Sequence, residues 1–197
     1  MIKEVLVYDN IIPKDLQEEI IDKMYNKFAW YFVPDITEGK SDVRRQERPG
    51  FSHIFYLTPG KVNSDYSPYV DTLVENTANK LGIKKYKIDQ SRGFLQLPLN
   101  ENFCGTEIDT PHVDLKGNHL VFLYYVKDCD GDTIIYKQKT LKGMNDTYEE
   151  LEILTRVTPK QGRMIVFDGT HWHTGTQPKS DIRCLINTNI RIDESIN

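Results

Sequence analysis

The stretch VTPKQGRMIVFDGTHWHTGTQPKSDIRCLINTNIRI, residues 157–192, decides the fold. It holds two apolar runs rich in β-branched residues, RMIVFDG and RCLINTNIRI, with glycine, proline and serine between them. Such runs at this spacing are typical of short β-strands joined by turns. Further runs of the same kind occur after residue 85, at YKID, GFLQLPL, HLVFLYYV, DTIIYKQ and ILTRVTP. The series predicts an all-β sandwich or barrel.

The region before residue 86 predicts helices. Pro13 suits the first turn of a helix, where its missing N–H costs nothing, and apolar residues then recur at helical spacing up to Phe28. A second helix is expected over residues 66–81, because its apolar residues share one face and Gly82 stands where a C-cap glycine belongs. Strands are expected at 2–8 and 51–57, and a long polar loop at 34–50.

The chain is therefore expected to be α+β and mainly β, with helices that support one β-rich core. It has no recognisable internal repeat, low-complexity segment or interdomain linker. We expect one domain over residues 1–197, with a helical support region at 1–85 and the β core at 86–193.

The composition limits the classes of function. The 197 residues are 39% hydrophobic and carry a net charge of −4, so the chain can bury a core and lacks the basic footprint of a dedicated nucleic-acid binder. The cluster of Arg44, Arg45 and Arg48 is interpreted as part of a solvated loop. The three cysteines are odd in number and match no zinc or redox pattern. With no signal-peptide or membrane-span pattern, the expectation is a soluble, cytoplasmic protein.

Two segments carry candidate metal ligands. His112 and Asp114 are two positions apart, so on a strand they point to the same face. A third imidazole comes late in the chain, at the end of an apolar strand. Two histidines and one carboxylate on one face of a metal form the facial triad of non-haem iron(II) sites. This triad leaves the remaining coordination positions of the metal open. His171 and His173 compete for the third place, because they too are two positions apart.

The C-terminal half resembles the 2-oxoglutarate/Fe(II)-dependent dioxygenase superfamily, and within it the prolyl 4-hydroxylase-like branch in its compact phage and bacterial form. The resemblance rests on the order and spacing of PHVD at 111–114, LYYV at 123–126, DGDTIIY at 130–136, VTPKQGRMIVFDG at 157–169, HTG at 173–175 and then Arg183. It implies a double-stranded β-helix (jelly-roll) core. For a phage-encoded member, the location would be the host cytoplasm.

The resemblance also implies a role for each matched residue. His112, Asp114 and His173 would bind Fe(II), and the HTG context favours His173 over His171. Arg183 would hold the 5-carboxylate of 2-oxoglutarate, with a donor from Tyr125. Apart from the resemblance, Thr133, Asn187 and Asn189 are further candidate residues of the pocket. With O2, and with ascorbate as an auxiliary reductant, the enzyme would hydroxylate a C–H bond and release succinate and CO2.

Two other readings stay open. A zinc-dependent hydrolase or isomerase on a β-barrel also uses histidine and carboxylate ligands with an open position. A non-enzymatic jelly-roll binding protein could keep the motifs without the activity. A carboxylate anchor such as Arg183 favours the dioxygenase.

The substrate is not fixed by the sequence. A prolyl or other peptidyl residue leads, and a free amino acid, a small metabolite or a nucleobase is left open. We expect a peptide, protein or small-molecule substrate and neither a membrane nor a nucleic-acid partner. The 34–50 loop, Trp30, Tyr31 and Arg92 are candidate contributors to the substrate entrance.

Overall fold

The computed structural model describes residues 2–36, 48–99, 108–143 and 150–192. Its elements in chain order are β1 (Leu6–Tyr8), α1 (Lys14–Asn26), β2 (Tyr31–Val33), β3 (Gly50–Leu57), β4 (Lys61–Val62), α2 (Ser67–Leu81), β5 (Tyr86–Gln96), β6 (Leu120–Tyr125), β7 (Thr133–Lys139), β8 (Ile153–Val157), β9 (Met164–Asp168), β10 (His171–Gly175) and β11 (Arg183–Ile192). Arg44, Arg45 and Cys104 lie outside the described residues.

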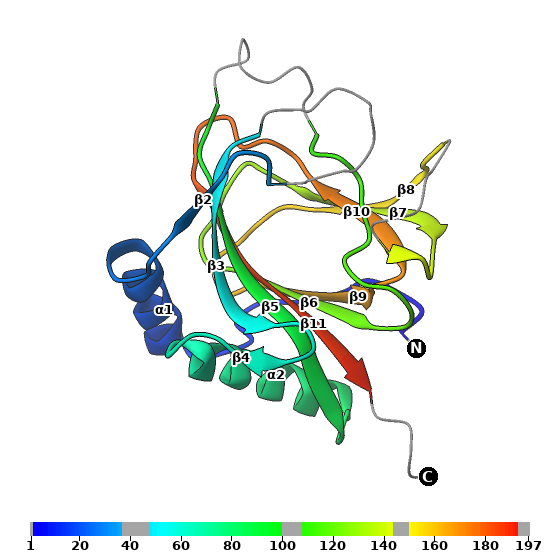
Figure 1. The fold of residues 1–197 in the computed structure, drawn as a ribbon, viewed down its shortest axis with the longest axis horizontal. Coiled ribbons are helices and arrows are strands. Elements are labelled where there is room, and N and C mark those ends of the chain that lie inside the picture. Colours follow the sequence, from blue (N-terminus) through cyan, green and yellow to red (C-terminus); the bar gives the residue numbers. More distant parts are fainter. Residues whose placement is uncertain (1, 37–47, 100–107, 144–149, 193–197) are drawn as a thin grey trace.

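The strands form two antiparallel sheets that face each other (Figure 1). The large sheet has the order β1-β9-β6-β11-β5-β3-β2, with β4 added on β3. The small sheet has the order β10-β7-β8. Two facing antiparallel sheets are the architecture of a jelly roll, and the expectation of a mainly β chain with a jelly-roll core is confirmed.

The helices cover the outer face of the large sheet, on the side away from β7, β8 and β10 (Figure 1). Ile20 and Met24 of α1 and Val70 and Leu73 of α2 are buried in one apolar cluster with the large sheet. α2 ends at Gly82, which has a left-handed φ of 70° and donates its N–H to the last turn of the helix. Pro13 immediately precedes α1 rather than lying in its first turn. Neither α1 nor α2 is long and apolar enough to cross a bilayer.

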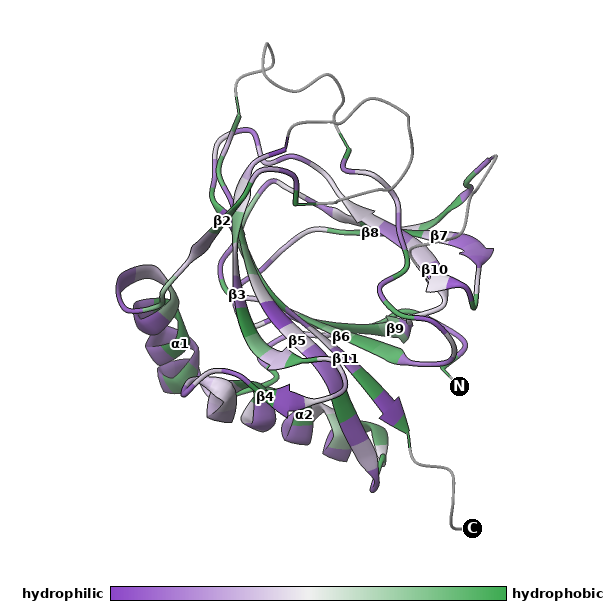
Figure 2. Cartoon of the chain, in the orientation of Figure 1, coloured by the Kyte–Doolittle hydropathy of each residue, from purple (hydrophilic) through white to green (hydrophobic). Residues whose placement is uncertain are grey.

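Strand β6 is buried on both faces, which explains its unbroken apolar sequence. Leu120, Phe122 and Tyr124 face the helices, whereas the alternate residues Val121 and Leu123 face the space between the sheets. Figure 2 shows β6 and β9 coloured almost throughout as hydrophobic. Strand β6 therefore presents apolar side chains to the space between the sheets, and a polar side chain buried there needs a partner.

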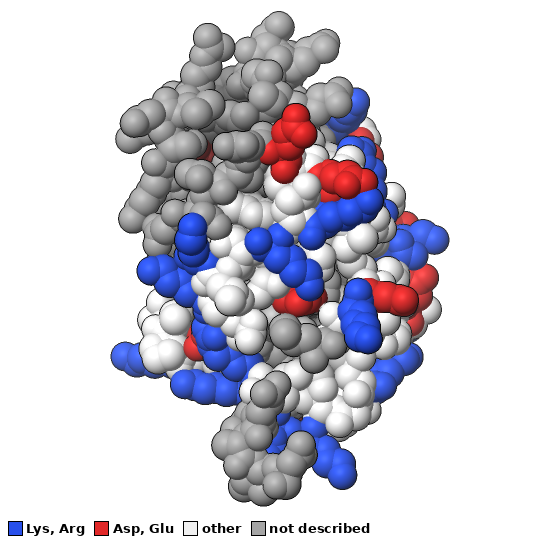
Figure 3. Space-filling view, turned by 90° about the vertical axis from the view of Figure 1, so that its right-hand side faces the viewer, with Lys and Arg blue, Asp and Glu red and all other residues white. Residues whose placement is uncertain are grey.

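Several strands differ from the expected segments. YKID and GFLQLPL belong to one long strand, β5, which pairs with β11 along its length. The segment HWHTG forms β10, and the short β2 and β4 are additional strands. The expected strand at 2–8 is shorter, at 6–8. On the surface, basic and acidic side chains are interspersed over the face shown in Figure 3.

Candidate metal centre

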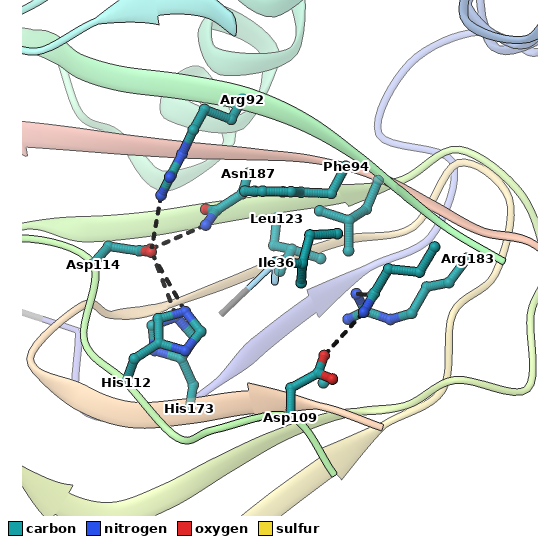
Figure 4. Close-up of a pocket in the computed structure, with 13 residues that line it drawn as sticks. Ile36, Arg92, Phe94, Asp109, His112, Asp114, Leu123, His173, Arg183 and Asn187 are labelled. Carbon is teal, nitrogen blue, oxygen red and sulfur yellow. Dashed lines mark hydrogen bonds and ion pairs between the residues drawn. The ribbon is translucent and has the colours of Figure 1, made fainter. Parts of the chain in front are cut away.

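His112, Asp114 and His173 meet at one end of a pocket between the sheets (Figure 4). One ligand atom from each residue lies within 4.8 Å of the others. The Nε2 atoms of His112 and His173 are 3.7 and 3.6 Å from the carboxylate oxygens of Asp114. The two histidines are also joined through their backbones, because each N–H donates to the other's carbonyl at 3.0 Å. This backbone bridge holds the segment from His112 to Asp114 beside β10.

Hydrogen bonds at Nδ1 orient both imidazoles. His112 Nδ1 lies 3.0 Å from the carbonyl of Thr110, and His173 Nδ1 lies 3.0 Å from the carbonyl of His171. A carbonyl only accepts, so each Nδ1 carries the proton and each Nε2 offers its lone pair to the centre of the cluster. His173 Nε2 and Asp114 Oδ1 are buried without a hydrogen-bond partner among the described residues. Both atoms carry lone pairs and face the centre of the cluster, so a divalent metal bound there would coordinate them.

The protonation states also suit metal binding. Burial, reinforced by the neighbouring His173, lowers the pKa of His112 to about 4, so its imidazole is neutral at neutral pH. Burial opposes ionisation of Asp114, but His173, His112 and Arg92 together hold the pKa of its carboxyl well below the usual value. Asn187 Nδ2 donates to Asp114 Oδ2 at 3.0 Å, and Asp114 Oδ1 lies 3.7 Å from His112 Nε2. The cluster therefore offers the neutral imidazole of His112, Nε2 of His173 and one carboxylate.

His171 lies outside this cluster. Its Nδ1 is 2.6 Å from the carbonyl of Tyr136, within the small sheet. The pairing of β10 with β7 shifts register between His171 and His173, so the two side chains do not share a face as regular strand alternation would require. Of the two alternatives, the structure brings His173 to His112 and Asp114.

Arg183 lies at the other end of the pocket and is buried (Figure 4). Its Nε donates to the carbonyl of Gly131, its Nη1 to Gln96 Oε1 and its Nη2 to Thr133 Oγ1, each at 2.9 Å. The Tyr125 hydroxyl donates to the same Thr133 oxygen at 2.7 Å. Tyr125 and Thr133 therefore lie beside Arg183, and they hold its guanidinium in place.

The wall between the two ends is built from cross-strand pairs of β11 and β5. Arg183 faces Gln96, Leu185 faces Phe94, and Asn187 faces Arg92. All six residues line the pocket, together with Leu123 of β6. Asn189 is one step further along the same face of β11, is buried, and is not among the described residues that line the pocket. The pocket thus has polar groups at both ends and an apolar middle.

Neither a protein-family model nor a curated protein sequence matches the chain. Solved structures do match. The viral collagen prolyl hydroxylase of Paramecium bursaria Chlorella virus-1, in its 2-oxoglutarate complex, superposes with a TM-score of 0.59 at 17% identity and covers 97% of both chains. The chain has the fold of the 2-oxoglutarate/Fe(II) oxygenases.

Two further structures agree with this oxygenase fold. A 2OG-Fe(II) oxygenase family oxidoreductase from Burkholderia pseudomallei has a TM-score of 0.62 at 11% identity, over 96% of this chain and 85% of that one. A prolyl hydroxylase from Trichoplax adhaerens, in complex with a hypoxia-inducible factor peptide fragment, has a TM-score of 0.56 at 13% identity, over 95% and 83% of the two chains. The similarity therefore spans nearly the whole chain, including the N-terminal helices.

Within the oxygenase fold, the pocket contains an ion pair that sequence reasoning missed. Asp109 lines the pocket next to Arg183, accepts from Gln96 Nε2 at 3.0 Å, and lies 3.0 Å from Arg48 Nη1. Burial raises the pKa of Asp109, although Arg48 and Gln96 favour its ionised form. Arg48 is only 1% exposed, so its interpretation as part of a solvated loop is wrong. Its partners come from distant segments, and no local pattern could have revealed them.

Gly175, the glycine of the HTG motif, allows Asp109 and Arg183 to approach the backbone of β10 closely. A Cβ at that position would lie 3.1 Å from Asp109 Oδ2 and 3.3 Å from the Arg183 guanidinium. Any side chain here would push against both charged groups. The glycine is therefore explained by the close approach of two side chains, since it is not at a left-handed turn.

Proposed function

We propose that this protein is an Fe(II)- and 2-oxoglutarate-dependent dioxygenase that hydroxylates a C–H bond. The observation that carries the proposal is one pocket with His112, Asp114 and His173 at one end and the buried Arg183 at the other. The oxygenase fold supports it, because the most similar structures include a complex with 2-oxoglutarate. The orphaned Nε2 and carboxylate atoms support a metal at that end.

The residues of this chain would divide the work as follows. The histidines and Asp114 would hold iron, and Asn187 would keep the Asp114 carboxylate turned toward it. The guanidinium of Arg183 would bind the 5-carboxylate of the oxo-acid with two parallel hydrogen bonds. Bound iron, the oxo-acid and O2 supply the oxidising chemistry, which consumes the oxo-acid to succinate and CO2.

Residues behind Arg183 would fix its position, and apolar residues that line the pocket would limit access of water. Arg183 donates to Gly131, Gln96 and Thr133, so rotation of its guanidinium would break three hydrogen bonds. Thr133 is itself held by the hydroxyl of Tyr125. Leu185 and Phe94 line the middle of the pocket, where an aliphatic chain between two polar ends would lie. An apolar middle that limits water would strengthen the electrostatic interactions at both ends.

The leading substrate class is a prolyl or other peptidyl residue. Two of the similar proteins are prolyl hydroxylases, and one of them was solved with a peptide fragment bound. We propose that the whole chain, residues 1–197, forms the one catalytic domain, because the similarity covers both its helical and its β regions.

An anaerobic titration tests the proposal. Purified metal-free protein receives Fe(II) and then 2-oxoglutarate, and the visible metal-to-ligand charge-transfer band is recorded. The band should form in the wild type and be lost in His173→Ala and Arg183→Met. Two matched controls should keep it: His171→Ala, two positions along the same strand, and Arg156→Met, an exposed arginine on β8. Thermal melts confirm that each variant is folded.

The alternatives predict a different result. A zinc hydrolase would bind zinc tightly through the same three ligands, show no charge-transfer band and respond little to Arg183→Met. Tight zinc binding without the band in the wild type would refute the dioxygenase proposal. A band without succinate formation from any substrate tested in air would favour the binding-protein reading.

A further inference from the structure

The metal end of the pocket contains a second arginine, Arg92, for which the proposed iron and oxo-acid sites give no role. Arg92 lies on β5 opposite Asn187 of β11 and lines the pocket. Its side chain is 26% exposed, and its Nη2 is 3.6 Å from Asp114 Oδ1. Its guanidinium also lies over the ring of Phe94, 5.1 Å from the centroid. Figure 4 shows it pointing down from β5 toward Asp114.

Metal binding would change the electrostatic surroundings of Arg92. Among the described residues, its acidic partner is Asp114, at a distance too long for a hydrogen bond. The oxygen that faces Arg92 is also the orphaned Oδ1 that a metal would take. A divalent cation bound to Asp114 would place a positive charge beside the Arg92 guanidinium. The negative charge of Asp114 would then be neutralised by the metal, and an unpaired guanidinium is unfavourable in a partly buried site.

The charges of the pocket therefore leave room for one more anion. Asp109 is neutralised by Arg48, so Asp114, Arg92 and Arg183 are the remaining charged side chains among the described residues that line it. A divalent metal and a doubly charged oxo-acid would cancel each other. Asp114 contributes one negative charge and the two arginines contribute two positive charges, so one net positive charge would then remain in the pocket.

The geometry supports the same conclusion. The Arg183–Gln96 and Asn187–Arg92 pairs are separated by the apolar Leu185–Phe94 pair. Four residues along a strand span roughly 13 Å, so the two guanidiniums enter the pocket from well-separated positions on the same wall. Arginine binds carboxylates in a planar, charge-assisted geometry. A guanidinium at each end and an apolar middle suit ligands with carboxylates at both ends.

We propose that Arg92 binds a carboxylate at the metal end of the pocket; this rests on the proposed dioxygenase function. The carboxylate has two chemical sources. It is either the 1-carboxylate of the oxo-acid, which the charge count already includes, or a carboxylate of the molecule that is oxidised, which that count favours. In the second case the substrate is an acidic molecule, with its carboxylate close to the C–H bond that reacts, in place of an uncharged prolyl side chain.

The test measures binding rather than turnover. Wild type, Arg92→Met and Arg92→Lys are loaded anaerobically with Fe(II) and titrated calorimetrically with 2-oxoglutarate. Acetate is then added to each Fe(II)–2-oxoglutarate complex as a carboxylate probe, and its binding is followed through the charge-transfer band. The exposed Arg156→Met is the matched control. A charge-assisted hydrogen bond predicts a loss of about 10-fold or more in affinity for Arg92→Met, with partial recovery in Arg92→Lys.

The two sources give different results. Weaker 2-oxoglutarate binding in Arg92→Met assigns Arg92 to the oxo-acid. Unchanged 2-oxoglutarate binding with loss of the acetate response assigns it to the substrate. If both titrations match the wild type, or if Arg92→Met lowers only the affinity for Fe(II), then Arg92 merely supports Asp114 and the proposal is overturned. A wild type without the band would instead refute the dioxygenase function itself.

Discussion

Replacing Arg48 by methionine should destabilise the protein by about 3–5 kcal/mol, the usual effect of removing one partner from a buried ion pair. Arg48 Nη1 and Asp109 Oδ1 are 3.0 Å apart, and the two side chains are 1% and 3% exposed. Methionine keeps an unbranched stem of similar reach, so the lost free energy comes mainly from the uncompensated Asp109 carboxylate. In a domain of this size, the melting temperature should fall by roughly 6–20 °C.

The pH dependence of the Arg48→Met variant follows from the direction of the Asp109 pKa. Burial raises the folded-state pKa of Asp109 above its ordinary value of 3.8, and loss of Arg48 should raise it further. The folded state then keeps a proton that the unfolded state releases, so the free energy of unfolding falls as pH rises above 3.8. The variant should therefore lose more stability at about pH 8 than at about pH 5.

Urea unfolding of the metal-free protein at both pH values measures this prediction. Asp109→Asn in the Arg48→Met background removes the unpaired charge and should restore at least about 2 kcal/mol of the loss. The reasoning is refuted if Arg48→Met stays within about 1 kcal/mol of the wild type at the higher pH, or if Asp109→Asn gives no recovery.

Other predictions concern the pocket. Asn187→Leu removes the donor to Asp114 and should weaken Fe(II) binding roughly 10–100-fold in a chelator competition; an unchanged affinity would show that Asp114 needs no such support. Thr133→Val removes the acceptor for Arg183 and should weaken 2-oxoglutarate binding about 10-fold by calorimetry, whereas equal affinities would contradict the assigned anchor. The metal-free protein should lose stability as pH falls from 6.5 toward about 4, because unfolded His112 takes up a proton that the folded form excludes. His112→Gln should flatten that part of the pH–stability curve.

Local sequence patterns predicted much of the fold correctly, because they record which residues face the core. The apolar run of β6 and the helical spacing of α2, with Gly82 at its end, required no knowledge of distant contacts. The prediction failed where polar residues interrupt a strand. Ser91 lies between the YKID and GFLQLPL runs in the sequence, yet its hydroxyl forms a hydrogen bond with Thr188 Oγ1 across the β5–β11 pairing at 2.8 Å. A partner on another strand turned an expected turn into a continuous strand.

For the site, the spacing of His112 and Asp114 and the order of the later motifs predicted which residue types would converge. The sequence alone left His171 and His173 as alternatives, since regular alternation puts both on one face. A register shift in β10 separates them. Similarly, Asn187 and Asn189 share a face of β11, but of these two it is Asn187 whose amide donates to Asp114 and which lines the pocket.

The sequence by itself therefore determined the strand pattern, the covering helices and the set of candidate ligands, because those depend on periodicity and on motif spacing along the chain. Only the tertiary structure decided that Arg48 pairs with Asp109 and that Arg92 faces Asp114. The physical reason is that charges in a pocket are set by side chains from strands and loops far apart in sequence. Periodicity specifies the face on which a side chain lies, whereas sheet register and chain crossing specify which side chain it meets there.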